Sequence, residues 1–93
     1  MIETVITANG DYQILDPEDF YRATTATSSV VIPENSAAAT LIFGYAGTSN
    51  EFVGYPDGTF NDGRIIDHGV GLKLMVRASG ISANTVTIRV YPS

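Results

Sequence analysis

The sequence predicts an all-β protein, built as a single antiparallel β-sandwich with a jelly-roll-like arrangement of about eight short strands. Segments rich in β-branched and aromatic residues recur at intervals of about 8 to 12 residues. Glycine, proline, asparagine and aspartate separate these segments, and no stretch has the apolar period of a long helix. An immunoglobulin-like sandwich comes second, because the chain lacks the cysteine and tryptophan landmarks of that fold.

The first two strands are predicted close to the N-terminus. Residues 2–7 are rich in β-branched side chains and are followed by Asn9-Gly10, a dipeptide typical of turns. Residues 12–15 form a second extended segment. We therefore expect two short strands joined by a turn.

A helical turn is predicted directly after the second strand. Asp16 is suited to the N-cap position, and Pro17 to the first position of a helix, so we expect a short helical turn near residues 17–22. The Ala, Thr and Ser tract of residues 23–29 fits either a strand or an extended segment. Residues 1–28 are thus a candidate for a partly extended N-terminal arm.

The centre of the chain contains two further predicted strands. Residues 29–32 are apolar and β-branched, and Pro33 is expected to end this strand. Residues 38–45 are apolar on both faces, which is typical of a central sandwich strand. The alanines at 37–39 are compatible with a helix, but the run is short and contains Gly44, so a strand is favoured.

The stretch Phe52 to Gly71 contains five of the nine glycines and the only histidine. Strands are predicted over residues 51–55 and 64–67. The sequences Tyr55-Pro56-Asp57-Gly58 and Asn61-Asp62-Gly63 combine residue types that favour turns. We interpret the stretch as a corner where the chain doubles back between strands.

The C-terminal region predicts a β-hairpin. Apolar and polar residues alternate over residues 72–79 and again over residues 85–91, with a connection of about five residues between the two segments. Each segment presents its apolar side chains to one face. Basic side chains lie on the other face: Lys73, Arg77 and Arg89.

Length and charge exclude several classes of protein. The 93 residues suit one domain, residues 1–93, with a modest core. The net charge is −5, and the five basic residues are spread singly, so we expect no nucleic-acid partner. The absence of cysteine excludes disulfides and thiolate metal sites. No apolar run is long enough for a membrane span or signal peptide, so a soluble protein is expected.

No set of residues predicts an enzyme. His68 follows Asp67, but neighbours in an extended strand point to opposite faces, and no serine or threonine lies in a recognisable nucleophile turn. We interpret the histidine as a surface or hydrogen-bonding residue. No catalytic residue and no cofactor are therefore expected.

Calcium binding is a weaker interpretation of the same stretch. Oxygen donors gather at Asp57, Asn61, Asp62 and Asp67, and calcium is bound by such ligands. Their spacing does not match the EF-hand pattern, and Asp and Asn in turns more often cap their own backbone. We therefore expect no metal site, although the sequence leaves calcium open.

The surface composition favours self-association. Only 16% of the residues are charged, and a small chain with few charges tends to place part of its exterior against another subunit. We therefore expect a homo-oligomer.

Two segments carry a resemblance to a known class of proteins: Val31-Ile32-Pro33-Glu34-Asn35-Ser36, which leads into a strand, and Ala78-Ser79-Gly80-Ile81-Ser82, which precedes the strand Val86 to Val90. In style the chain resembles the small all-β decoration or cement proteins of tailed-bacteriophage capsids. The resemblance implies a structural virion protein, assembled in the host cytoplasm, that stabilises the capsid lattice by contacts with the major capsid protein. It also implies a trimer and a capsid-facing N-terminal arm.

A carbohydrate-binding or adhesive module is the alternative function. The tyrosines and phenylalanines could stack on a sugar, although core and interface packing accounts for them as well. Under either function we expect the stretch Phe52 to Gly71 to be a contact surface. The candidate interaction residues are Phe52, Tyr55, Asp57, Phe60, Asp62 and His68.

Overall fold

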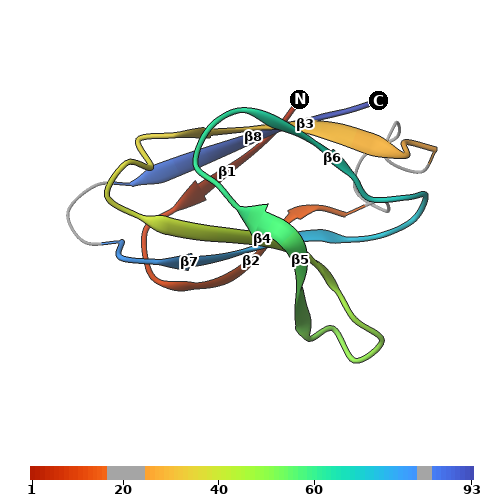
Figure 1. Ribbon diagram of the computed structural model, residues 1–93, viewed down its shortest axis with the longest axis horizontal. Helices are drawn as coiled ribbons and strands as arrows, with labels where there is room; N and C mark the ends of the chain where they lie inside the picture. Colours follow the sequence, from red (N-terminus) through yellow and green to blue (C-terminus); the bar gives the residue numbers. More distant parts are fainter. Residues whose placement is uncertain (17–24, 82–84) are drawn as a thin grey trace.

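The computed structural model describes residues 1–16, 25–81 and 85–93. It contains two four-stranded antiparallel sheets that pack face to face, as Figure 1 shows. The prediction of an all-β sandwich is confirmed. The helical turn expected near residues 17–22 lies outside the described residues.

Eight strands build the two sheets, and all the connections that the structure describes are short. The strands are β1 (Ile2–Ile6), β2 (Gly10–Leu15), β3 (Ser28–Glu34), β4 (Thr40–Ala46), β5 (Phe52–Thr59), β6 (Arg64–Asp67), β7 (Leu74–Ser79) and β8 (Val86–Pro92).

The strand order has the nested pairing of a jelly roll. Sheet A has the order β1-β8-β3-β6 and sheet B the order β2-β7-β4-β5. The first strand therefore pairs with the last, the second with the seventh, the third with the sixth and the fourth with the fifth. Two nested Greek keys of this kind define the jelly roll.

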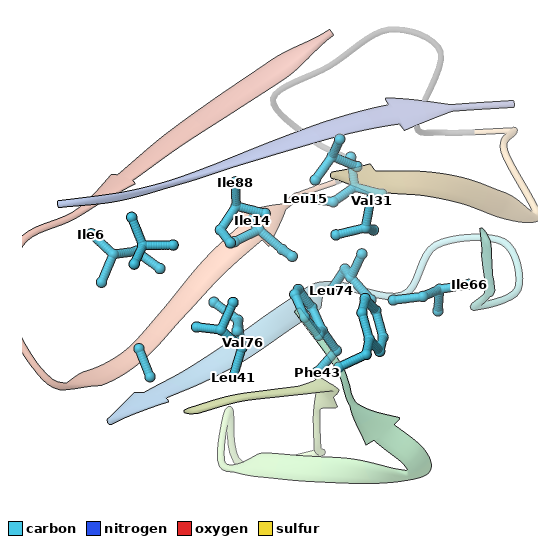
Figure 2. Packing of buried hydrophobic residues seen from close by; sticks show 14 residues of the cluster. Ile6, Ile14, Leu15, Val31, Leu41, Phe43, Ile66, Leu74, Val76 and Ile88 are labelled. Atoms are coloured by element: carbon cyan, nitrogen blue, oxygen red, sulfur yellow. The ribbon is translucent and has the colours of Figure 1, made fainter. Parts of the chain in front are cut away.

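The core lies between the sheets and follows the alternation in the sequence. Ile88 and Val31 project from sheet A toward Val76, Leu41 and Phe43 of sheet B, as Figure 2 shows. All five side chains are fully buried. Since each buried apolar side chain contributes about 1.5–3 kcal/mol, this cluster supplies most of the driving force for folding.

The C-terminal hairpin prediction is wrong. β7 lies in sheet B between β2 and β4, whereas β8 lies in sheet A between β1 and β3. Both strands bury alternate residues, and that pattern is the same whether two strands pair or face each other across a core. The two strands therefore lie on opposite sides of the gap of about 10 Å that separates packed sheets.

The turn predicted at Tyr55-Pro56-Asp57-Gly58 is also wrong, because these residues belong to β5. β5 is an edge strand, and its register against β4 shifts between Ile42 and Gly44, so a proline is tolerated there. Gly58 is needed for close approach rather than for a turn, since a Cβ there would lie 2.2 Å from the carbonyl oxygen of Phe43. The turn residues at 61–63 do connect β5 to β6, as predicted.

Two further expectations are settled by the strand pairing. β1 and β2 pair with β8 and β7, so residues 2–15 are integral to the sandwich and do not form a free arm. β3 continues through Pro33, because its pairing with β6 ends at Val31 and leaves the proline with a neighbour on one side only. The strand predicted over residues 38–45 is present as β4, and the helical alternative is excluded.

Candidate functional site

The six predicted interaction residues do not form one continuous surface. Tyr55, Asp57 and Phe60 line a common pocket. Phe52 and Asp62 are each held by an arginine side chain. His68 lies inside the sandwich.

The pocket lies between β5 and β6, which are the edge strands of the two sheets on the same side of the sandwich. Its volume is about 310 Å³. This is at the lower end of the range for small-molecule sites, about 300–1,000 Å³. The lining residues are Tyr55, Pro56, Asp57, Gly58, Phe60, Arg64, Ile65, Ile66 and Asp67.

Three polar groups at this pocket have no partner among the described residues. The hydroxyl of Tyr55 is buried without a hydrogen bond. Burial, and then the neighbouring Tyr45, raises the pKa of Tyr55 above its usual value. The carboxylates of Asp57 and Asp67 form no ion pair with the described basic residues, which all pair elsewhere. The pocket is therefore rich in hydrogen-bond acceptors.

The aromatic rings of the predicted surface are covered rather than open. Phe60 stacks on Phe43, with ring centroids 4.3 Å apart, and the guanidinium of Arg64 lies 5.0 Å from the Phe60 centroid. Phe52 lies beneath the guanidinium of Arg77 at 4.5 Å. A sugar that stacks on either ring would have to displace an arginine.

Asp62 is paired with the same arginine that covers Phe60. Its carboxylate accepts a hydrogen bond of 2.9 Å from Nε of Arg64. This pair is exposed, so it contributes little to stability. No group of three or more potential metal ligands among His, Cys, Asp and Glu occurs in the described ranges.

His68 is not part of any surface, which corrects the prediction that it contributes to one. It is only 3% exposed. Its Nδ1 donates to the carbonyl oxygen of Gly69 at 2.8 Å, and its Nε2 lies 2.7 Å from the hydroxyl oxygen of Ser29. Because a carbonyl only accepts, Nδ1 carries a proton, and Nε2 forms a second hydrogen bond with the serine hydroxyl.

The contact between Ser29 and His68 was not foreseen from the sequence, since 39 residues separate them. The distance is that of a nucleophile and its base. However, Ser29 is completely buried, so a substrate cannot reach its hydroxyl in this conformation. The pair instead joins the start of β3 to the end of β6, where the backbone N–H groups of His68 and Gly69 both donate to the carbonyl of Thr27.

The outer face of sheet A carries an exposed apolar row that the sequence analysis missed. Tyr91 and Ile65 both lie opposite Val30 in the strand register, on its two sides. Because Ile2 lies opposite Val90, Met1 continues the row beside Tyr91. Ile65 is 70% exposed and Met1 55%. We call Met1, Tyr91, Val30 and Ile65 the apolar row.

The charges next to the apolar row neutralise one another in part. Arg89 forms ion pairs with Glu3 on β1 and Glu34 on β3. Hydrogen bonding to Glu34, and more weakly the charge of Glu3, raises the pKa of Arg89 above its usual value. Two carboxylates and one guanidinium leave a single net negative charge in this group. Asp67, two residues after Ile65 on the same face of β6, adds a second carboxylate at the edge of the sheet.

Comparisons with family models, curated proteins and solved structures give no match for this chain. In the part of the chain that the structure describes, no helix is long and apolar enough to cross a membrane. The chemistry of the surface is therefore the basis for the functional argument.

Proposed function

We propose that this protein is a non-enzymatic structural protein of a virion, a capsid decoration protein that stabilises the capsid lattice through protein–protein contacts. The observation that carries the proposal is the apolar row. Monomeric proteins seldom leave large apolar side chains side by side on an open sheet face, and such a face usually serves as an interface.

The topology supports this assignment by analogy. Jelly rolls are common in viral capsid proteins, although they also occur in lectins and cupins, so the fold by itself does not choose between functions. The low content of charged residues, 16%, adds support, because interface cores are depleted in charge.

The test is binding to capsids assembled from the major capsid protein encoded in the same genome. Purified protein should co-sediment with these capsids at a saturating, lattice-defined ratio, and should raise the temperature at which they disassemble. Val70→Glu places a charge at an exposed apolar residue outside the sheets. As the control variant, it should bind and stabilise capsids as the unmodified protein does. Absence of both binding and stabilisation at micromolar protein would refute the assignment.

A carbohydrate-binding module is the second candidate, and the pocket between β5 and β6 favours it. The carboxylates of Asp57 and Asp67, which line the pocket and form no ion pair with the described basic residues, are suited to sugar hydroxyls. Since the chain has no tryptophan, tyrosine fluorescence would report binding directly.

A glycan array, followed by fluorescence titration, separates the two candidates. The carbohydrate function predicts saturable binding that is lost in Asp57→Asn and in Asp67→Asn. The structural function predicts no glycan binding, and capsid stabilisation that neither substitution abolishes.

A further inference from the structure

We infer that the outer face of sheet A is the interface with a second copy of this chain, formed by a twofold axis that lies between the two faces and runs along the strands. The inference rests on the proposed function and deepens it, because it names the partner that covers the apolar row. It concerns self-association before any contact with a capsid.

The order of side chains in the apolar row makes the face complementary to itself. A twofold axis along the strands reverses the row, so that Met1 faces Ile65 of the second copy and Tyr91 faces Val30 of the second copy. The large aromatic side chain thus packs on the smallest one of the row. An axis along the row would instead place Tyr91 on itself and leave a gap between two valines.

The charges of the face are compatible with a second copy but not with an anionic partner. Arg89 is occupied by Glu3 and Glu34, so the face offers no free cation to a phosphate or to an anionic membrane. A second copy presents the same apolar row, and apolar contact needs no charge complement. The chain as a whole has a net charge of −5, which makes association sensitive to salt.

The size of the face limits how strong the dimer can be. Its strands have 5, 7, 7 and 4 residues. At about 3.3 Å per residue and about 4.8 Å between strands, they cover about 360 Å² in plan. A standard interface buries ~800 Å² per partner, so we expect a weak dimer whose population depends on protein concentration.

A dimer replaces the trimer that the resemblance implied. A single patch that meets itself is closed by a twofold axis, whereas a trimer needs two different patches that complement each other. The apolar row is one patch, and its two ends match each other. The geometry therefore favours two copies.

The first experiment measures the mass in solution by sedimentation equilibrium of the full chain, its Ile65→Glu variant and its Val70→Glu variant. Ile65 and Val70 have similar exposure, 70% and 61%, but only Ile65 lies in the apolar row. We expect the unmodified chain and Val70→Glu to form dimers of twice 9.9 kDa. Ile65→Glu should raise the dissociation constant at least tenfold, since a dimer contains two copies of the change.

A second experiment tests the orientation of the axis. Tyr91→Glu and Val30→Lys should each weaken the dimer when studied singly. An equimolar mixture should restore it, because the new carboxylate faces the new ammonium across the interface. Circular dichroism and a thermal melt establish that each variant is folded.

Several outcomes would overturn the inference: a monomer at all concentrations, a trimeric mass, equal effects of Ile65→Glu and Val70→Glu, or a mixture that dissociates like its components. Failure here and failure of the proposed function are distinguishable. If the protein is a monomer that stabilises capsids, only the inference of a dimer is refuted. If it is a dimer that does not bind capsids, only the proposed decoration function is refuted.

Discussion

Tyr55 bears a buried hydroxyl oxygen without a hydrogen-bond partner among the described residues. An unpaired buried polar group costs about 1–3 kcal/mol of stability. Tyr55→Phe removes that group and keeps the ring beside Tyr45, whose centroid lies 5.3 Å away. We expect the free energy of unfolding at pH 7 to stay the same or to rise by up to about 2 kcal/mol.

Urea denaturation at neutral pH measures this effect, and a second series at alkaline pH checks its cause. Because the pKa of Tyr55 is raised in the folded state, the unfolded chain loses this proton first. The stability of the unmodified protein should therefore fall as the pH rises past about 10. Tyr55→Phe should reduce that fall, and an unchanged pH dependence would contradict the assignment.

The contact between Ser29 and His68 gives a second prediction for single residues. Ser29→Ala leaves Nε2 of His68 buried without its hydrogen-bond partner, so the free energy of unfolding should fall by about 1–3 kcal/mol. The matched control is Ser28→Ala, which removes the neighbouring hydroxyl that contacts Ser93 at the surface. Denaturation curves of equal midpoint for the two variants would show that the buried pair has no special role.

At the scale of the strands, β5 packs closely against the backbone of β4. A Cβ at Gly58 would lie 2.2 Å from the carbonyl oxygen of Phe43, on the backbone of the neighbouring strand. Gly58→Ala should therefore destabilise the protein by about 1–3 kcal/mol or more. Gly63→Ala is the control, because its nearest atom, in the side chain of Ile32, is 3.7 Å away. A loss of stability as large in the control would refute the close-approach explanation.

β2 and β7 are joined on their outer face by an ion pair between Asp11 and Arg77, with an Nε to Oδ1 distance of 2.8 Å. The hydrogen bond from Arg77 lowers the pKa of Asp11 below its usual value near 3.8. Because the pKa of Asp11 is lowered in the folded state, its carboxylate stabilises the fold above pH 3.8. This contribution is lost as the pH falls through the folded-state pKa.

Asp11→Asn should therefore lower the denaturation midpoint slightly at pH 6, and the difference from the unmodified protein should shrink as the pH falls below 3.8. Because both side chains are largely exposed, added salt should reduce the effect. A difference that grows on acidification would have the wrong sign for this pair.

At the scale of the whole molecule, a dimer built on sheet A couples folding to association. Because only folded chains form the dimer, a higher protein concentration favours the folded state and raises the melting temperature. We expect this rise for the unmodified protein and for Val70→Glu, measured over a hundredfold range of concentration. Ile65→Glu should melt at a temperature that is nearly independent of concentration.

The alternation of apolar and polar residues was sufficient to predict a sandwich of eight short strands. This local pattern also identified the buried faces of β7 and β8, because a residue's position in a pleated strand decides which face it occupies. Pattern is a property of single strands and does not depend on their neighbours. For that reason it correctly predicted where β4 and β6 form, but could not pair β7 and β8.

Strand pairing, and with it every candidate site, was decided by the tertiary structure. Ser29 meets His68 because β3 pairs with β6, and the apolar row unites side chains from β3, β6, β8 and the chain start. The sequence by itself determined where most strands form and which face β7 and β8 turn toward the core, since the face follows from the two-residue period of the pleat. Only the nested jelly-roll pairing determined which exposed residues become neighbours, because contacts between distant strands depend on register and sheet order rather than on local pattern.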